Sequence, residues 1–108
     1  MNQHGNRLMI FEKMSQEEKA ARKMIDRLHS DPVGTRILNR RKVVGECWQY
    51  VGWDNGNGYK KIKVKGRADY VHRYVFELFN GFLLGSQEVG HICLNRSCFR
   101  PDHLRIGS

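Results

Sequence analysis

The spacing of apolar residues near the N-terminus is that of an amphipathic helix. Between Gln16 and His29 the apolar positions follow intervals of three and four, which place them on one helical face. Ser15 and Glu18 form a capping box at the start of this segment, since the hydroxyl and the carboxylate can each bond a free amide. The residues of the apolar face are Ala20, Ala21, Met24, Ile25 and Leu28.

A second, shorter helix is predicted directly after the first. Asp31 followed by Pro32 is typical of a helix start, with the acid as cap and the proline at the first helical position. This helix is expected to continue to about Arg41. Residues 1–45 are therefore predicted to form a helical arm.

The period of the pattern changes to two from Glu46 onward, which predicts strands. The glycine-rich run at 54–58 predicts a loop, and Lys65-Gly66 predicts a tight turn. An antiparallel sheet of three strands is expected, at residues 47–51, 59–65 and 67–71. The fold class is therefore α+β, with residues 46–108 as the second unit.

Residues 71–80 show the helical period again, and Gly81 follows as a C-terminal cap. The expected buried stripe, packed under the sheet, consists of Val71, Val75, Leu78 and Phe79. His72 lies beside the stripe, where a structural histidine is the more frequent interpretation. Pro101-Asp102 predicts that another helix begins near His103.

Soft metal ligands gather near the C-terminus. Cys93, Cys98 and His103 are spaced five residues apart in a polar loop, and Cys47 upstream would complete a set of four. Three thiolates and one imidazole make a closed structural zinc site. A Cys93–Cys98 disulfide or two buried free thiols are the alternatives. His91, just before the loop, is either a further ligand or a side chain held beside the metal for chemistry.

The odd number of cysteines argues against a framework of disulfides alone, and it favours a reducing cytoplasm. The apolar run at residues 8–11 is too short for a secretory signal. No apolar run is long enough to span a membrane. Residues 46–108 are too few to hold a core without a staple, a role that zinc fits.

The chain is basic, with a net charge of +8 and an isoelectric point near 9.8. This charge favours a nucleic acid as partner, while a charge that serves solubility is the alternative. On the predicted sheet the candidate DNA contacts are Lys61, Lys63, Lys65 and Arg67. On the arm they are Arg40 and Arg41, which a solvated helix face would also explain.

The run HICLNRSCFRPDHL at residues 91–104 resembles the signature of HNH nucleases of the His-Cys box type, which include homing and phage endonucleases built on the ββα-metal finger. The likeness extends upstream to Cys47. It implies cleavage of double-stranded DNA, with His91 as general base and Arg73 near the scissile phosphate. It also implies structural Zn²⁺ on Cys47, Cys93, Cys98 and His103, and a catalytic Mg²⁺ or Mn²⁺.

The sequence departs from this family at the catalytic metal. The family's Asn or His ligand lies on a helix after the finger, beyond the last residue given, and many relatives carry Asp where this chain has Gly90. We expect one of three explanations: a piece of a longer enzyme, a site completed by a partner, or a zinc-stapled module that binds DNA and cuts it poorly. A homodimer, which would allow both strands to be cut, is compatible with the sequence.

Overall fold

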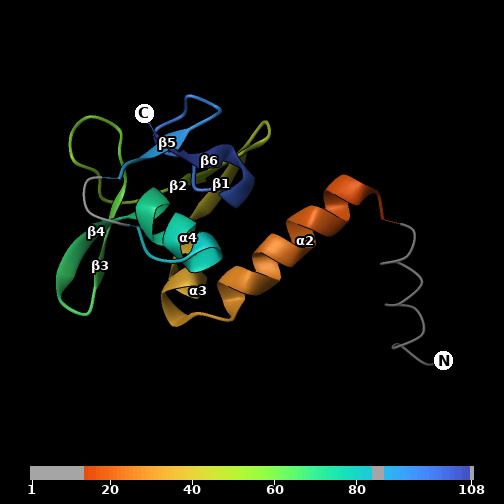
Figure 1. The fold of residues 1–108 in the computed structure, drawn as a ribbon, viewed down its shortest axis with the longest axis horizontal. Coiled ribbons are helices and arrows are strands. Elements are labelled where there is room, and N and C mark those ends of the chain that lie inside the picture. The colour runs from red at the N-terminus through yellow and green to blue at the C-terminus, as the bar shows by residue number, and fades with distance from the viewer. Residues whose placement is uncertain (1–13, 84–86, 108) are drawn as a thin grey trace.

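The computed structural model describes residues 14–83 and 87–107, so the first part of the predicted arm, residues 1–13, lies outside it. Helices and short antiparallel strand pairs make up the fold, which confirms the α+β class (Figure 1). In chain order the elements are α2 Gln16–His29, α3 Pro32–Leu38, β1 Arg41–Val44, β2 Cys47–Tyr50, β3 Lys61–Val64, β4 Arg67–Tyr70, α4 Val71–Asn80, β5 Val89–His91, the 3-10 helix η1 Pro101–His103 and β6 Leu104–Ile106.

The two N-terminal helices begin where their caps predict. The Ser15 hydroxyl accepts from the amide of Glu18, and the Asp31 carboxylate accepts from the amide of Gly34. The second helix ends at Leu38, earlier than expected. Residues 41–44 form strand β1 instead, because they pair with β2. Figure 1 shows α2 projecting away from the body that the other elements form.

The prediction of a three-stranded antiparallel sheet is wrong, because the strands pair differently. The described strands form three separate two-stranded sheets, β1–β2, β3–β4 and β5–β6. Strand β2 pairs with β1 across the Gly45-Glu46 turn and not with β3. Lys65 and Gly66 form the predicted turn between β3 and β4, both with positive φ, as two-residue hairpins of this twist require.

Helix α4 has the predicted bounds and ends at Gly81, where φ is 91°. Its buried residues are Val71, His72, Val75 and Phe76, while Leu78 and Phe79 are only partly buried. The face that packs inward is thus rotated from the predicted stripe and includes the histidine. It contacts α2, β4, β5 and β6.

The helix expected near His103 is absent. The single 3-10 turn η1 leads directly into β6, which pairs antiparallel with β5 so that Leu104 lies opposite His91. The amide of Ile92 also donates to the His103 carbonyl over 2.8 Å. Strand pairing therefore competes successfully with the local helix signal and holds the segments of His91 and His103 side by side.

One hydrophobic core joins the arm to the rest of the described chain. Leu28 of α2 and Ile37 of α3 are fully buried in the same cluster as Val75 of α4 and Phe99. Arg27 and Arg36 donate across this junction to the carbonyls of Leu78 and Lys63. The boundary between residues 45 and 46 stays a prediction, although both sides share a core and a hairpin. No described helix is long and apolar enough to cross a bilayer.

Candidate active site and metal centre

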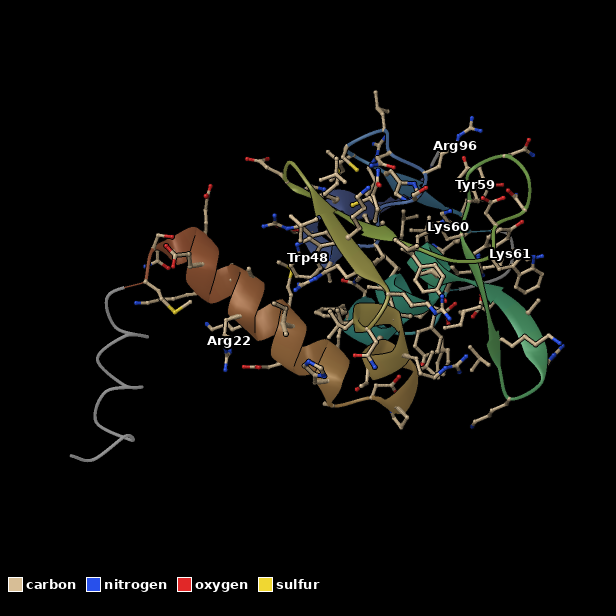
Figure 2. The ribbon with its side chains drawn as sticks, turned by 180° about the vertical axis from the view of Figure 1, so that it is seen from behind. Arg22, Trp48, Tyr59, Lys60, Lys61 and Arg96 are labelled. Carbon is tan, nitrogen blue, oxygen red and sulfur yellow. The ribbon has the colours of Figure 1, made fainter. Side chains whose placement is uncertain are left out.

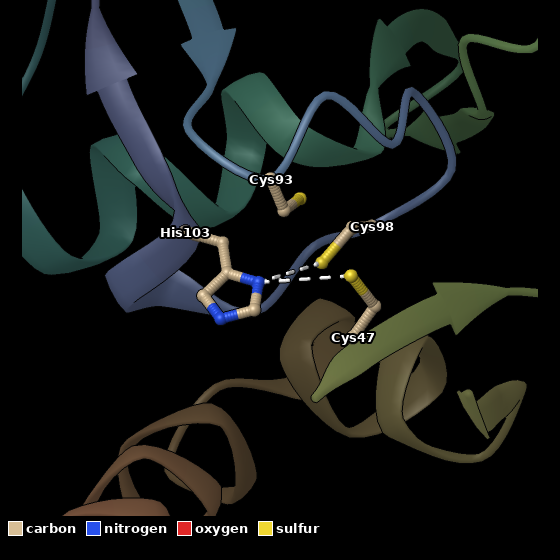
Figure 3. A group of neighbouring side chains, drawn as sticks. All are labelled: Cys47, Cys93, Cys98 and His103. Atoms are coloured by element: carbon tan, nitrogen blue, oxygen red, sulfur yellow. Dashed lines mark hydrogen bonds between the residues drawn. The ribbon is translucent and has the colours of Figure 1, made fainter. Parts of the chain in front are cut away.

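The four predicted metal ligands converge at one point (Figure 3). One donor atom from each of Cys47, Cys93, Cys98 and His103 lies within 4.8 Å of every other. Nδ1 of His103 is 3.6 Å from the Cys98 sulfur and 3.8 Å from the Cys47 sulfur. This arrangement can hold a metal ion, and the cysteines are free thiols without a disulfide among them.

Strand β2 brings the remote Cys47 to this cluster. The loop after β5 runs beside β2, with the amide of Tyr50 donating to the Ser97 carbonyl and the amide of Phe99 donating to the Trp48 carbonyl. The resulting bridge sets Gln49 opposite Cys98. Main-chain hydrogen bonds thus carry Cys47, at the start of β2, to the other ligands.

The electrostatics of the cluster favour a cation. The pKa of Cys98 is raised to about 12, mainly by burial and to a smaller extent by the neighbouring thiols Cys93 and Cys47. Burial, again as the first cause, also raises the pKa of Cys47. These thiols are therefore protonated at neutral pH when no ion is near, whereas a bound metal ion reverses the preference and deprotonates its thiol ligands.

His91 lies on β5 with its ring fixed by the main chain. Nε2 is 2.9 Å from the carbonyl oxygen of Cys98, which can only accept, so the ring donates there and the lone pair is on Nδ1. The side chain is 9% exposed, and burial lowers the pKa of His91. The neutral imidazole that the resemblance implies is therefore the form present at neutral pH.

A pocket of about 380 Å³ is lined by His72 and Tyr59, whose ring centroids lie 4.8 and 6.2 Å from that of His91. Arg73, on α4, lines it and is held by a 3.0 Å hydrogen bond to the Gln87 carbonyl and a 3.4 Å ion pair with Glu77. Its guanidinium is therefore fixed at the pocket wall. The predicted basic residue and the predicted base thus belong to the same region.

Tyr59 and His72 complete this region, and the sequence did not single out Tyr59. The His72 ring is 4.8 Å from the His91 ring and 5.5 Å from the Tyr59 ring, between centroids. Arg96 covers Tyr59 from outside, with the guanidinium 5.0 Å from its ring. The signal for His72 was its phase on the helix, since it shares a face with Val75 and Phe76.

The predicted DNA contacts fall into two groups. On the β3–β4 hairpin, Lys63 and Lys65 are exposed near the turn, while the Lys61 ammonium lies 5.0 Å from the centre of the Trp53 ring. Arg67 is exposed too, but it pairs with Val64 and so lies on the opposite face from Lys63. Figure 2 shows Tyr59, Lys60, Lys61 and Arg96 at the same end of the molecule, away from Arg22 on α2.

The two basic residues of the arm have internal partners. Arg40 donates to the Val51 carbonyl over 3.3 Å, and the Arg41 guanidinium lies 4.9 Å from the centre of the Trp48 ring. Both contacts join the arm to β2 and its end. These side chains therefore have a structural role in addition to the predicted role at phosphates.

Comparison with known proteins identifies a family match and several relatives. Residues 69–108 match the sequence model of a family described as HNH endonuclease. Protein 2.8 of Escherichia phage T7 is 34% identical over 76 residues, which are 68% of this chain and 51% of that protein. Protein 7.7 of the same phage is 32% identical over 63 residues, 58% of this chain and 48% of that protein.

A third relative is the uncharacterized gene 5.3 protein of Enterobacteria phage T3. It is 35% identical over 57 residues, which are 47% of this chain and 56% of that protein. The chain therefore spans about half the length of the curated relatives that it matches. No solved structure gives a significant match.

Proposed function

Residues 69–108 match the family described as HNH endonuclease, and from this premise we propose that the protein is a metal-dependent endonuclease that hydrolyses phosphodiester bonds of double-stranded DNA. The observation that carries the proposal is the fixed, neutral imidazole of His91 beside a pocket that Arg73 lines. The phage relatives agree with action inside a host cell, in the manner of homing or other phage-borne nucleases.

The chemistry follows from the tautomer of His91. Nδ1 carries the lone pair and takes a proton from water, whose oxygen attacks the phosphorus. The bond to the leaving sugar oxygen breaks, and that oxygen takes up a proton from solvent. Arg73 offsets negative charge on the phosphate in the transition state. A divalent ion such as Mg²⁺ or Mn²⁺, when bound, supplies further charge stabilisation.

Zinc is the metal we propose for the Cys47, Cys93, Cys98 and His103 cluster. Bond lengths of about 2.3 Å to sulfur and about 2.05 Å to nitrogen give tetrahedron edges of about 3.8 Å between sulfurs and about 3.5 Å between sulfur and nitrogen. Two of the three edges to Nδ1 of His103 are 3.6 and 3.8 Å, and all four donor atoms lie within 4.8 Å of one another. Strands β5 and β6, which flank the cluster, would be the two strands of the ββα-metal finger.

The test is a nicking assay on supercoiled plasmid with Mg²⁺ or Mn²⁺. The zinc-loaded protein is expected to convert the plasmid to open-circular or linear form, and excess EDTA should stop the reaction. A protein that retains zinc and binds DNA but leaves the plasmid intact with either ion would contradict the enzyme assignment.

That outcome would support a zinc-stapled DNA-binding module as the second candidate. One feature of the chain favours this candidate: position 90 is a glycine, where many members of the family that the chain resembles carry Asp. DNA affinity without cleavage is the expected property of such a module.

DNA affinity is expected to fall steeply with salt, because bound cations leave the phosphates when the protein binds. Lys63 is exposed beside the β3–β4 turn, away from the proposed catalytic groups. Lys63→Ala should reduce the slope of log affinity against log salt by about 0.9 if the lysine contacts one phosphate. Fluorescence anisotropy on a duplex measures both quantities. Lys63→Arg keeps the charge and should keep the slope, whereas an unchanged slope in Lys63→Ala would remove this contact.

A further inference from the structure

His72, which lines the pocket, has a buried polar atom without a partner. Among the described residues, Nδ1 of His72 is the one buried side-chain nitrogen or oxygen that makes no hydrogen bond. The His72 side chain is 8% exposed and lines the pocket, between the rings of Tyr59 and Tyr70. Buried polar atoms almost always have a partner, so this atom calls for a ligand.

The protonation state of His72 suits a metal ligand. Burial is the main cause that lowers the pKa of His72 to about 4, and His91 lowers it further, while a hydrogen bond with the backbone of Val89 acts in the opposite direction. A backbone bond that favours the protonated form is one that the ring donates. The ring is thus neutral at pH 7, donates to Val89, and has its lone pair on Nδ1.

Metal-binding histidines commonly show this arrangement. One ring nitrogen binds the ion while the other donates to a carbonyl or carboxylate, which fixes the ring and its tautomer. His72 lacks only the ion. His91 is held in the same way, through Nε2 to the Cys98 carbonyl, and its ring centroid is 4.8 Å away.

Glu88 provides a carboxylate in the same pocket. Its main chain is fixed, because the Glu88 carbonyl accepts from the amide of Gly107 over 2.8 Å, next to the β5–β6 pairs. One imidazole and one carboxylate suit Mn²⁺ and related first-row ions better than they suit Mg²⁺, which prefers oxygen. Nuclease metal sites often have one or two protein ligands and fill the rest with water and substrate phosphate.

We propose that this pocket binds a divalent cation of the Mn²⁺ class through Nδ1 of His72 and the carboxylate of Glu88. The cation would lie beside His91, and Arg73 on the same pocket wall would contact a phosphate bound to it. These two residues then take the place of the Asp ligand that many relatives carry at the position of Gly90. The catalytic use of the cation rests on the proposed function, but its binding does not.

The experiment titrates Mn²⁺ into the zinc-loaded full chain without DNA and follows the free-ion signal by electron paramagnetic resonance. One Mn²⁺ per chain is expected in addition to the zinc. His72→Ala and Glu88→Gln should each weaken Mn²⁺ binding at least about tenfold, because each removes a ligand. The matched controls are His29→Ala and Glu46→Gln, which change exposed residues of the same types and should bind as the unmodified protein does.

Two results would overturn the proposal: no Mn²⁺ binding at millimolar concentration, or unchanged affinity in both variants. If His72→Ala loses its zinc and misfolds, Glu88→Gln decides alone, because Glu88 is exposed. Mn²⁺ binding that depends on these residues in a protein without nuclease activity would refute the proposed function only. Manganese-dependent cleavage with affinity that is independent of both residues would refute this inference only.

Discussion

Removal of the proposed zinc ion is expected to unfold the part of the chain that surrounds the Cys47, Cys93, Cys98 and His103 cluster. Zinc contributes on the order of 10–16 kcal/mol of apparent binding energy to small finger domains. That is as large as the whole stability of a typical domain, about 5–15 kcal/mol. Chelation should therefore abolish the cooperative thermal transition, measured by near-ultraviolet circular dichroism, and metal analysis should show the loss of one zinc per chain.

Substitutions of the proposed ligands distinguish the loss of this metal site from general effects of the chelator. Cys47→Ser tests the remote ligand, and His103→Ala tests the imidazole. Both should lower zinc content and the transition temperature together. His29→Ala is the matched control, because that histidine is exposed on α2. A Cys47→Ser protein that keeps one zinc and an unchanged transition would exclude Cys47 from the site.

Substitution of His91 is expected to have the largest effect on activity. His91→Ala removes the proposed base, the group that would take the proton from water, which should lower the single-turnover rate by about 10²–10⁴-fold. The rate is measured on supercoiled plasmid at saturating protein, so that weaker DNA binding does not contribute. Zinc content should be unchanged, since His91 is not among the four converging ligands.

Because His91 is buried, His91→Ala could lose activity through a packing defect, and a second variant distinguishes this effect from loss of the base. His91→Gln keeps an amide donor for the Cys98 carbonyl and most of the side-chain volume, but it supplies no base. Its cleavage rate should be as low as that of His91→Ala, while its thermal transition temperature should be closer to that of the unmodified protein. A His91→Gln enzyme that cuts at the normal rate would assign the base to another residue.

The elements that the sequence predicted well are those that depend on local interactions. Helix α2 begins as predicted because the Ser15 hydroxyl accepts from the Glu18 amide within one turn. Helix α4 ends at Gly81 for the same kind of reason, since few residues other than glycine tolerate its φ of 91°. The turn at Lys65-Gly66 is local too.

Strand pairing was predicted poorly, because the partner of a strand is chosen by the whole fold. Residues 41–44 have helical neighbours in sequence, yet they pair with β2. Residues 104–106 follow a helix-start signal, yet they pair with β5. In both cases main-chain hydrogen bonds to a second segment outweigh a weak local preference.

The sequence by itself determined which side chains are the candidate metal ligands, because two cysteines and a histidine at spacings of five in one short loop have few other uses, and Cys47 is the remaining cysteine of the chain. It also determined the bounds of the long helices. Only the tertiary structure decided that Cys47 reaches that loop, through the pairing of β2 with residues 97–99. It alone set His72 against His91, since α4 and β5 meet through packing and main-chain contacts between segments distant in sequence, which no local pattern encodes.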